Sequence, residues 1–449
     1  MQIIPRKDPN EKYWNEEMET LSPDGYRKVH EKALLKQLEY VFDKSAFYQN
    51  KFGEAGIKLG DIKGLDDLSK LPFTEKMELR DSQLNHPPLG SHIACNMGDV
   101  ARVYTTSGTT GRPTFIGVTH KDIEVWREAA ARAFWTGGFR PDSIIPLIVS
   151  PFFIAASYAD ALSTIGTIVP IGVGATEKLI ASYNYVGANE CLATSSFPLH
   201  FAASCRKRGT EPKSLGIRRI LAGGEPGASI PSVRKEVEET FGCIFLEMMG
   251  NGDMCSEMFS ECEYKRGMHF IAQGIVHPEL IDPDTLEIQE WKEGAKGELV
   301  YTSLDRDCIP LVRFRSRDHI EVTQMECECG RTGPGIRVIG RTDDMLNVQG
   351  VNVFPSAVRD YVASMVPRTT GAIEIQMHKA PPEGWKPPIH IKVEYGQDPG
   401  DLDQLKDELQ RMIREKLIFR SDIELLPPDT LPKFEYKAKL VRKLYEEEK

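Results

Sequence analysis

The sequence predicts an α/β protein followed by a second, smaller unit at the C-terminal end. Three features lead to this prediction. The chain has 449 residues, about two to three times the usual length of one domain. From residue 99 onward, extended apolar runs alternate with amphipathic helical patterns, which is typical of an α/β sheet. A further unit of extended runs and a helix begins after the turn at residues 340–344.

The elements of the larger part follow in chain order. Helical patterns and loops are mixed over the first hundred residues. Thr119 and Asp122 then have the spacing of a capping box that starts a helix. Its apolar face is expected to contain Ile123, Trp126, Ala130 and Phe134. Strands are expected at residues 144–149, 167–171, 219–222, 244–248 and 298–301. Because strands and helices interleave, we expect parallel strands joined by crossover connections.

The C-terminal unit has two expected strands, at residues 372–377 and 389–393, separated by a Pro-rich surface loop at 380–388. An amphipathic helix follows. Its apolar stripe is expected to contain Leu402, Leu405, Leu409, Met412 and Ile413. The acidic tail at residues 446–448 is expected to be solvated.

Composition and charge exclude several classes of protein. Hydrophobic residues make up 41% and charged residues 27%, which argues against a fibrous or wholly disordered chain. The 56 Lys and Arg residues against 66 Asp and Glu residues give a net charge of −10. We therefore expect no nucleic-acid partner and no anionic membrane surface as a partner. A local basic site for a phosphorylated small molecule remains open.

The N-terminal segment has no apolar core of a signal peptide, and no run of about eighteen apolar residues follows. The sequence therefore predicts a soluble, cytoplasmic protein. The nine cysteines are expected to be reduced thiols or metal ligands rather than a disulfide framework. Cys243, Cys255 and Cys308 are expected in the core as small apolar residues.

The most informative segment is TSGTTGRPT, residues 106–114. Small hydroxyl residues and glycines let a backbone wrap closely around an anion, and Arg112 adds a fixed positive charge. The spacing is not that of a Walker-type phosphate loop, which needs GxxxxGK[ST]. The alternative is a Ser/Thr/Gly-rich surface loop without a ligand.

In its order of residues this segment resembles the adenylate-forming acyl-CoA synthetase superfamily, most closely the phenylacetate-CoA ligase branch. Six other segments resemble that branch in the same order along the chain. They are FYQNKFGEAG at 47–56, LPFTEK at 71–76, AGGEP at 222–226, RFRSRD at 313–318, GRTDDML at 340–346 and GVNVFP at 350–355. The resemblance covers essentially the whole chain.

The resemblance implies a large multi-sheet α/β domain at residues 1–341, which binds ATP and the acid, and a small mobile α+β lid domain at 342–449. It also implies an AMP-forming acid-CoA ligase. In such enzymes a carboxylate attacks the α-phosphate of ATP, which gives an acyl-adenylate and pyrophosphate, and the thiol of CoA then displaces AMP. The implied substrates are ATP, CoA and a small carboxylic acid, with Mg²⁺ as cofactor and a homodimer as the assembly.

The resemblance also implies an ATP site. Its residues are Thr106, Ser107, Gly108, Thr109, Thr110, Gly111, Arg112, Gly224, Glu225, Pro226, Met249, Gly250 and Asp318. Asp318 corresponds to the aspartate that binds the ribose hydroxyls. The alternative for Asp318 is a surface carboxylate paired with Arg315 or Arg317.

Lys437 corresponds to the catalytic lysine, which would bridge the carboxylate and the α-phosphate during attack. Lys433 and Lys439 are the alternatives, and Tyr436 replaces the usual glycine. Arg341, also assigned a catalytic role, would contact phosphate or ribose. Asp343 corresponds to the hinge residue. Gly350 would lie on the path of the pantetheine chain of CoA, or else be an ordinary turn glycine.

One motif departs from the family. The usual YGxTE is replaced by Met249, Gly250, Asn251, Gly252 and Asp253. Met249 could pack its thioether against adenine, but the threonine hydroxyl is lost at Gly252. Asp253 could still bind magnesium with a shorter side chain. The departure indicates either a shifted nucleotide or weakened adenylation.

Cys262, His269, Cys327 and Cys329 form a candidate zinc site, because thiolate and imidazole ligands suit a closed tetrahedral structural site. The alternative is two unrelated loops with free thiols.

The acid pocket is expected to include Phe152, Phe153, Ser196 and Phe197, apolar side chains edged by hydroxyl groups. Such a pocket suits a small aromatic or compact aliphatic acid. The alternative for each of these side chains is plain core. His200 is expected to be a core histidine, and the alternative is a histidine that faces the substrate.

Two other functions stay open at this point. One is an adenylyltransferase of the same branch that modifies a deazaflavin hydroxyl without CoA. The other is a catalytically weak nucleotide-binding protein, which the altered motif at residues 249–253 suggests.

Overall fold

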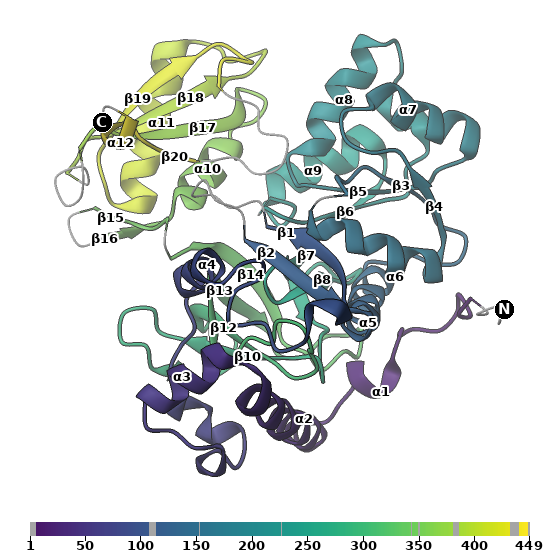
Figure 1. Ribbon diagram of the computed structural model, residues 1–449. Coiled ribbons are helices and arrows are strands. Elements are labelled where there is room, and N and C mark those ends of the chain that lie inside the picture. The colour runs from purple at the N-terminus through teal and green to yellow at the C-terminus, as the bar shows by residue number, and fades with distance from the viewer. Residues whose placement is uncertain are drawn as a thin grey trace.

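Figure 1 shows the computed structural model of the chain, which describes residues 6–106, 114–151, 153–225, 227–342, 344–348, 351–379, 386–431 and 440–447. The first hundred residues are helical with loops, as predicted. Their α-helices are α1 (Glu16–Glu19), α2 (Pro23–Lys44), α3 (Ala46–Glu54) and α4 (Lys76–Asn85). Helix α2 starts at the N-cap Ser22, whose side chain accepts from the Gly25 amide, with Pro23 in the first turn.

Helix α2 brings a buried histidine against the main sheet. His30 is fully buried, and its Nε2 accepts a hydrogen bond of 3.0 Å from the Gly274 amide. The Nδ1 atoms of His30 and His277 lie 3.2 Å apart, so one ring donates to the other. Burial lowers the pKa of His30 to about 2 and the pKa of His277 to about 4. Both rings are therefore neutral in the folded protein at neutral pH.

This pair should make the protein less stable in mild acid. The unfolded chain binds protons at the ordinary histidine pKa of about 6.5, whereas the folded chain binds them only at lower pH. The contribution of the two neutral histidines to the free energy of unfolding is therefore complete above about pH 6.5. It should fall toward pH 4 by up to about 1.4 kcal/mol per pH unit for each ring. Urea unfolding at about pH 7 and about pH 5 measures the loss.

In the His277→Gln variant, the free energy of unfolding should change less between these two pH values than in the wild type. An unchanged pH dependence in His277→Gln would contradict the assignment.

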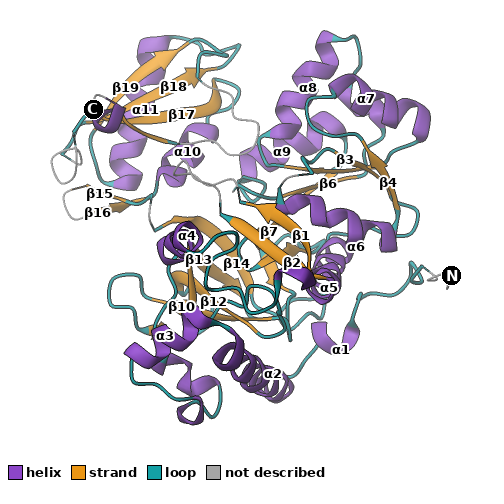
Figure 2. Ribbon diagram, viewed as in Figure 1, coloured by secondary structure: helices purple, strands orange, loops and turns teal. Residues whose placement is uncertain are grey.

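The described strands of the larger part form a ten-stranded mixed sheet and two smaller pairs (Figure 2). The order in the large sheet is β11-β10-β12-β13-β14-β9-β8-β7-β6-β5. Its strands are β5 (Glu190–Ala193), β6 (Arg219–Ala222), β7 (Ile244–Asn251), β8 (Cys255–Glu261), β9 (Met268–Phe270), β10 (Val276–Ile281), β11 (Ile288–Gln289), β12 (Lys296–Ser303), β13 (Phe314–Gln324) and β14 (Gly335–Arg341). The pairs are β1 (Val100–Thr105) with β2 (Phe115–Thr119) and β3 (Ile144–Leu147) with β4 (Thr167–Pro170).

The five predicted strands of this part are confirmed, but only some connections are parallel crossovers. The pairs β3 with β4, β5 with β6 and β6 with β7 are parallel. From β7 onward every pairing in the large sheet is antiparallel. The expected parallel crossovers therefore occur among β3 to β7, and the antiparallel half of the sheet was not predicted. Only residues 252–254 separate β7 from β8, and a parallel crossover needs a dozen or more.

Helices cover the sheets of the larger part (Figure 1). They are α5 (His120–Thr136), α6 (Tyr158–Ile165), α7 (Thr176–Ala181), α8 (Phe197–Lys207) and α9 (Pro231–Phe241), with the short 3₁₀ helix η4 (Ile154–Ser157) before α6. Helix α5 confirms the predicted capping box. Thr119 Oγ1 accepts from the Asp122 amide at 3.1 Å, and Asp122 Oδ2 accepts from the Thr119 amide at 2.9 Å. Trp126, Ala130 and Phe134 are buried on the predicted face.

The C-terminal unit has its own sheet and core. Its sheet has the order β19-β18-β17-β20 and lies apart from the large sheet in Figure 1. The elements are β15 (Leu346–Val348), β16 (Val351–Val353), α10 (Pro355–Ala363), β17 (Thr369–Met377), β18 (Ile389–Tyr395), α11 (Leu402–Leu417), β19 (Ser421–Leu426), β20 (Val441–Lys443) and α12 (Leu444–Glu447). Both predicted strands and the helix are confirmed. Leu405, Leu409 and Ile413 are buried, but Leu402, the first residue of the helix, is 39% exposed.

Among the described helices, none combines the length and apolar character needed to cross a membrane. All nine cysteines lie in described segments, and all nine are free. Cys243, Cys255 and Cys308 are buried, as predicted.

Candidate active site

The predicted phosphate loop connects two paired strands. β1 and β2 are antiparallel, with Thr105 opposite Phe115. The Thr106 amide donates to the Thr114 carbonyl at 3.2 Å, which brings the two ends of the loop together. Ser107, Gly108, Thr109, Thr110, Gly111 and Arg112 lie outside the described residues. The paired strands therefore fix the two ends of the segment, and Thr106 marks its start.

A lysine lies beside the start of this loop. Lys76 is the first residue of α4, and its Nζ lies 3.2 Å from Thr106 Oγ1 and 2.5 Å from Asp253 Oδ2. The side chain of Asp253 is 8% exposed, so the ion pair is largely shielded from water. A cation next to a phosphate loop can bind phosphate oxygens as a point charge. Sequence reasoning assigned no role to Lys76, although it is the lysine of the LPFTEK segment.

Asp253 fits the requirements of a magnesium ligand. Its Oδ1 is buried and has no hydrogen-bond partner within the described part of the chain, whereas Oδ2 faces Lys76. The Asp253 main-chain carbonyl accepts from Arg306 at 2.6 Å, which fixes the position of the residue. Magnesium prefers carboxylate oxygen and keeps several waters. The free Oδ1 is therefore the oxygen that could bind the metal.

Two glycines of the motif at residues 249–253 lie in closely packed positions. A Cβ on Gly250 would lie 1.8 Å from the Ser256 carbonyl oxygen of β8, so only glycine fits there. A Cβ on Gly252 would lie 3.0 Å from Thr106 Cγ2, so a threonine would press on the phosphate loop. Gly252, the position at which the threonine hydroxyl of the family is lost, therefore lies next to the side chain of Thr106. Met249 is 9% exposed and packs in the main core, and its contact with adenine stays a prediction.

The structure joins the predicted adenine-side loop to one predicted pocket residue. Glu225 is buried, and its Oε1 accepts from the Ser196 amide at 2.8 Å and from Ser196 Oγ at 2.5 Å. Ser195 Oγ donates to the Glu225 carbonyl at 2.9 Å. Gly224 has a φ of +83°, a conformation that favours glycine. Pro226 lies outside the described residues.

The other predicted pocket residues have different positions. Phe153 is half-buried and forms an isolated bridge with Thr105, next to the phosphate loop. Phe197 is the first residue of α8, and its ring stacks on that of Phe201 at 5.5 Å, so it packs against the core. Phe152 lies outside the described residues. His200 is exposed, so its assignment to the core was wrong; it occupies the outer face of α8.

The arginines of the RFRSRD segment are held in ion pairs. Arg313 donates to Glu279 at 3.2 and 3.0 Å, and Arg315 donates to Glu298 at 2.8 Å from each of two nitrogens. Both pairs are buried. Arg317 donates to Glu75 at 2.7 Å. These contacts fix the strand that presents the next residue, Asp318.

Asp318 pairs with the predicted catalytic arginine. Arg341 donates to Asp318 Oδ1 at 3.1 Å and to the Ser316 carbonyl at 3.2 Å. Asp318 and Arg341 lie opposite each other on the neighbouring strands β13 and β14. The structure therefore unites two residues that the sequence separates by more than twenty positions.

The chain leaves the large sheet immediately after Arg341. Thr342 Oγ1 donates to Glu298 Oε2 at 2.8 Å. Beyond that point, the rings of His319 and Phe354 lie 5.0 Å apart, which connects β13 to the start of α10. Asp343, Gly350 and Lys437 lie outside the described residues, as do Lys433 and Lys439.

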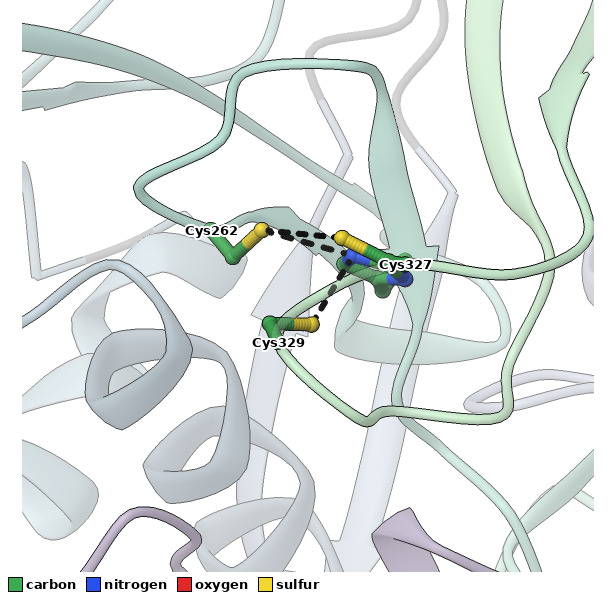
Figure 3. Close-up of side chains that lie close together, drawn as sticks. Cys262, Cys327 and Cys329 are labelled. Carbon is green, nitrogen blue, oxygen red and sulfur yellow. Dashed lines mark hydrogen bonds between the residues drawn. The ribbon is translucent and has the colours of Figure 1, made fainter.

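The predicted zinc ligands converge (Figure 3). Cys262 Sγ lies 3.8 Å from Cys327 Sγ and 3.4 Å from His269 Nε2, and Cys329 Sγ lies 3.4 Å from His269 Nε2. A tetrahedral zinc ion with bonds of about 2.3 Å to sulfur and about 2.0 Å to nitrogen spaces two sulfurs by about 3.8 Å. It spaces a sulfur and a nitrogen by about 3.5 Å.

The surroundings of His269 also suit a metal. Its Nδ1 lies 3.1 Å from the Gly333 carbonyl, which holds the ring with Nε2 toward the sulfurs. Three of the four residues are buried, and Cys327 is partly exposed. The four side chains therefore fit a closed zinc site.

Comparison with known proteins identifies the relatives of this chain. Residues 350–444 match the family model of the AMP-binding enzyme C-terminal domain. A phenylacetate-coenzyme A ligase of Thermus thermophilus is 32% identical, with 93% of this chain and 96% of the relative covered. The structure also resembles 2-hydroxyisobutyryl-CoA ligase in complex with R3-HIB-AMP in the postadenylation state. The TM-score is 0.88 and the identity 26%, with 99% of this chain and 96% of that one covered.

The same solved ligase has been captured in a second state, in complex with 2-HIB-AMP and CoA in the thioesterification state. Against that structure the TM-score is 0.71, with 27% identity and 99% and 96% of the two chains covered. The arrangement of this chain is therefore closer to the postadenylation state.

Proposed function

Because the chain belongs to the phenylacetate-CoA ligase family of adenylate-forming enzymes, we propose that it is an AMP-forming acid-CoA ligase. It converts a small carboxylic acid, ATP and CoA into the acyl-CoA thioester, AMP and pyrophosphate. The observation that supports this most directly is the contact of Lys76 with both Thr106 and Asp253. A phosphate loop, a cation and a carboxylate meet there, as phosphoryl chemistry requires.

In the first half-reaction, the loop after Thr106 holds the ATP phosphates through amide and hydroxyl donors. Lys76 stabilises charge on the departing pyrophosphate. Asp318 accepts from the ribose hydroxyls, and Arg341 lies beside it. Lys437 bridges the attacking carboxylate and the α-phosphate. Magnesium, when bound, neutralises phosphate charge, and Asp253 would hold it through Oδ1.

In the second half-reaction, the thiol of CoA attacks the acyl carbonyl and AMP leaves. We propose that residues 342–449 form a mobile lid, that Asp343 is the hinge, and that Gly350 lies on the path of CoA. The TM-scores against two states of one solved ligase differ, because this chain fits the postadenylation state better than the thioesterification state. This difference supports a rotation of residues 342–449 between the two half-reactions.

The acid is proposed to be a small aromatic or compact aliphatic one. Two contacts support a pocket between the phosphate loop and the adenine-side loop. Phe153 forms a bridge with Thr105, and the Ser196 hydroxyl donates a hydrogen bond to Glu225. The relatives found are CoA ligases, which favours thioester formation over transfer of adenylate to a deazaflavin. The contact of Asp253 with Lys76 argues against a degraded nucleotide site.

The test is pyrophosphate release from the purified chain with MgATP and a panel of aryl, hydroxy and short-chain acids, each with and without CoA. Release that depends on one acid, together with a CoA thioester, supports the ligase. Acid-dependent release without a thioester would favour another acceptor. ATP binding without release would favour a weak nucleotide-binding protein.

We further propose that Cys262, His269, Cys327 and Cys329 bind one structural zinc ion. The ligand separations and the hydrogen bond of His269 to Gly333 support it. The bound metal would connect the hairpin after β8 to the loop after β13.

Removal of this metal should destabilise the protein. The Cys327→Ser variant, or prolonged treatment with a strong chelator, should release about one zinc per chain and lower the melting temperature by several degrees. Zinc is measured by atomic emission and stability by calorimetry. Cys243→Ser, a buried cysteine outside the cluster, is the matched control and should keep its zinc. Protein purified without zinc and unaffected by the chelator would contradict the proposal.

We also propose a cytoplasmic homodimer. The nine free cysteines support a reducing compartment, and the dimer is proposed from family resemblance.

A further inference from the structure

A buried acid and a partly buried phenol lie together next to the proposed acid pocket. Glu257 on β8 is 2% exposed, and its Oε1 accepts a short hydrogen bond from the hydroxyl of Tyr158, the first residue of α6. The other oxygen, Oε2, is buried and has no hydrogen-bond partner among the residues that the structure describes. An unpaired buried polar atom costs about 1–3 kcal/mol. A protein retains such an atom where something else pairs with it.

Tyr158 and Glu257 lie near the proposed phosphate site. Phe153 forms a bridge with Thr105 at the start of the phosphate loop, and the 3₁₀ turn Ile154–Ser157 leads directly from Phe153 to Tyr158. A Cβ on Gly252 would lie 3.5 Å from Ile154 Cγ2, so this turn lies against the β7–β8 hairpin beside Asp253. Four residues, about 8 Å at the rise of a 3₁₀ turn, separate Ile154 from Tyr158.

β8 leads to Glu257 from the same hairpin. Glu257 follows Asp253 by four residues, and Cys255 Sγ donates to the Glu257 carbonyl at 3.5 Å between them. The side chains of Tyr158 and Glu257 thus meet where α6 and β8 lead away from the proposed phosphate site. An acid whose carboxylate reaches the α-phosphate would extend its tail toward them.

We infer that Glu257 and Tyr158 determine substrate specificity and select an acid with a hydroxyl group on its tail, which pairs with Glu257 Oε2. This inference rests on the proposed ligase function. Tyr158 holds Oε1, so the carboxyl group is oriented and Oε2 is the atom left for the substrate.

A hydroxyl suits this site better than other groups. Burial raises the pKa of Glu257 to about 8, so the carboxyl is mostly protonated at neutral pH and Oε2 can donate. A hydroxyl can accept from the protonated carboxyl and can also donate to the ionised one. An ammonium group would need the ionised form, and an apolar tail would leave Oε2 unpaired. Sites that bind a substrate hydroxyl discriminate strongly against analogues that lack it.

The test compares matched acids on the full-length protein. The pairs are 3-hydroxybutyrate with butyrate, 2-hydroxyisobutyrate with pivalate and 4-hydroxyphenylacetate with phenylacetate. The kcat/KM for acid-dependent pyrophosphate release is measured for each. We expect at least one pair in which the hydroxylated acid is preferred by about tenfold or more.

Glu257→Leu should reduce that preference to about one while the rate with the apolar partner is kept or raised. Glu257→Gln keeps the size and hydrogen-bonding capacity of the side chain and should retain a preference. Tyr158→Phe releases the carboxyl group and should give an intermediate ratio. Glu190, another buried glutamate with an unpaired oxygen, lies away from this site, so Glu190→Gln should keep the wild-type ratio.

A wild-type preference for the apolar acid in every pair would overturn the inference, as would an unchanged ratio in Glu257→Leu. If Glu257→Leu fails to fold, Tyr158→Phe decides through the same ratio. Failure of the ligase proposal looks different, because then no acid would support release of pyrophosphate by the wild type.

Discussion

Replacing Lys437 with alanine should lower the rate of acyl-adenylate formation by about 10²- to 10³-fold, the effect of removing one charged group that stabilises a transition state. The proposed ammonium group bridges two negative partners, the attacking carboxylate and the α-phosphate. Their charge converges during attack and is not yet shared in the ground state, so the affinity for ATP should change little. Acid-dependent pyrophosphate release in a single turnover, together with the dissociation constant of ATP, measures both effects.

The matched controls are Lys433→Ala and Lys439→Ala, the two neighbouring lysines of the same segment. Both should keep adenylation within about threefold of the wild type. The second half-reaction gives a further control. With preformed acyl-adenylate and CoA, Lys437→Ala should still produce thioester, because the proposed lysine acts only on the first step. A loss in Lys433→Ala equal to that in Lys437→Ala would place the catalytic role elsewhere.

Replacing Lys76 with methionine should reduce kcat/KM for ATP by about tenfold to a hundredfold. Hydrogen bonds to charged groups contribute about 1.5–3 kcal/mol, and each 1.4 kcal/mol corresponds to a factor of ten. Lys76 contacts Thr106 at the start of the phosphate loop, and its loss leaves Asp253 without its cation. We expect the KM for ATP to rise and the dependence on magnesium to shift toward higher concentration. Steady-state kinetics at varied ATP and magnesium concentrations measure both.

The Lys76→Met variant removes half of a shielded ion pair and therefore also affects stability. Lys51 offers the control, because it pairs with Glu78 of the same helix α4 and its side chain is 14% exposed. Lys51→Met should lower the melting temperature without changing the KM for ATP. If both variants change the KM equally, the effect arises from the position of α4, and Lys76 would have no direct contact with phosphate.

The sequence predicted the local elements well. The capping box of Thr119 and Asp122 starts α5 as expected, because both hydrogen bonds form between residues three apart. The buried stripe of α11 follows from helical periodicity, with the exception of Leu402, which is exposed at the first position of the helix. The antiparallel half of the large sheet was missed. Its short connections are visible in the sequence, but the alternation of strands and helices suggested crossovers.

The candidate site was predicted in part. The grouping of Cys262 with His269, Cys327 and Cys329 was expected from ligand type and spacing. The distances that fit a tetrahedral metal come only from the fold. The position of Asp318 next to Arg341 depends on the register of β13 against β14. Phe197 looked like a pocket residue, but its ring stacks on Phe201 in the core.

The sequence by itself determined the family, the local helices and strands, and the residue types that the reaction needs, because motifs and periodicity are local properties of the chain. Only the tertiary structure decided which distant groups meet. Lys76 reaches Asp253 across 177 positions, and Tyr158 reaches Glu257 across 99. Such contacts form because packing of the helices on the sheets places these side chains together. Their polar atoms then pair, because burial without a partner is costly.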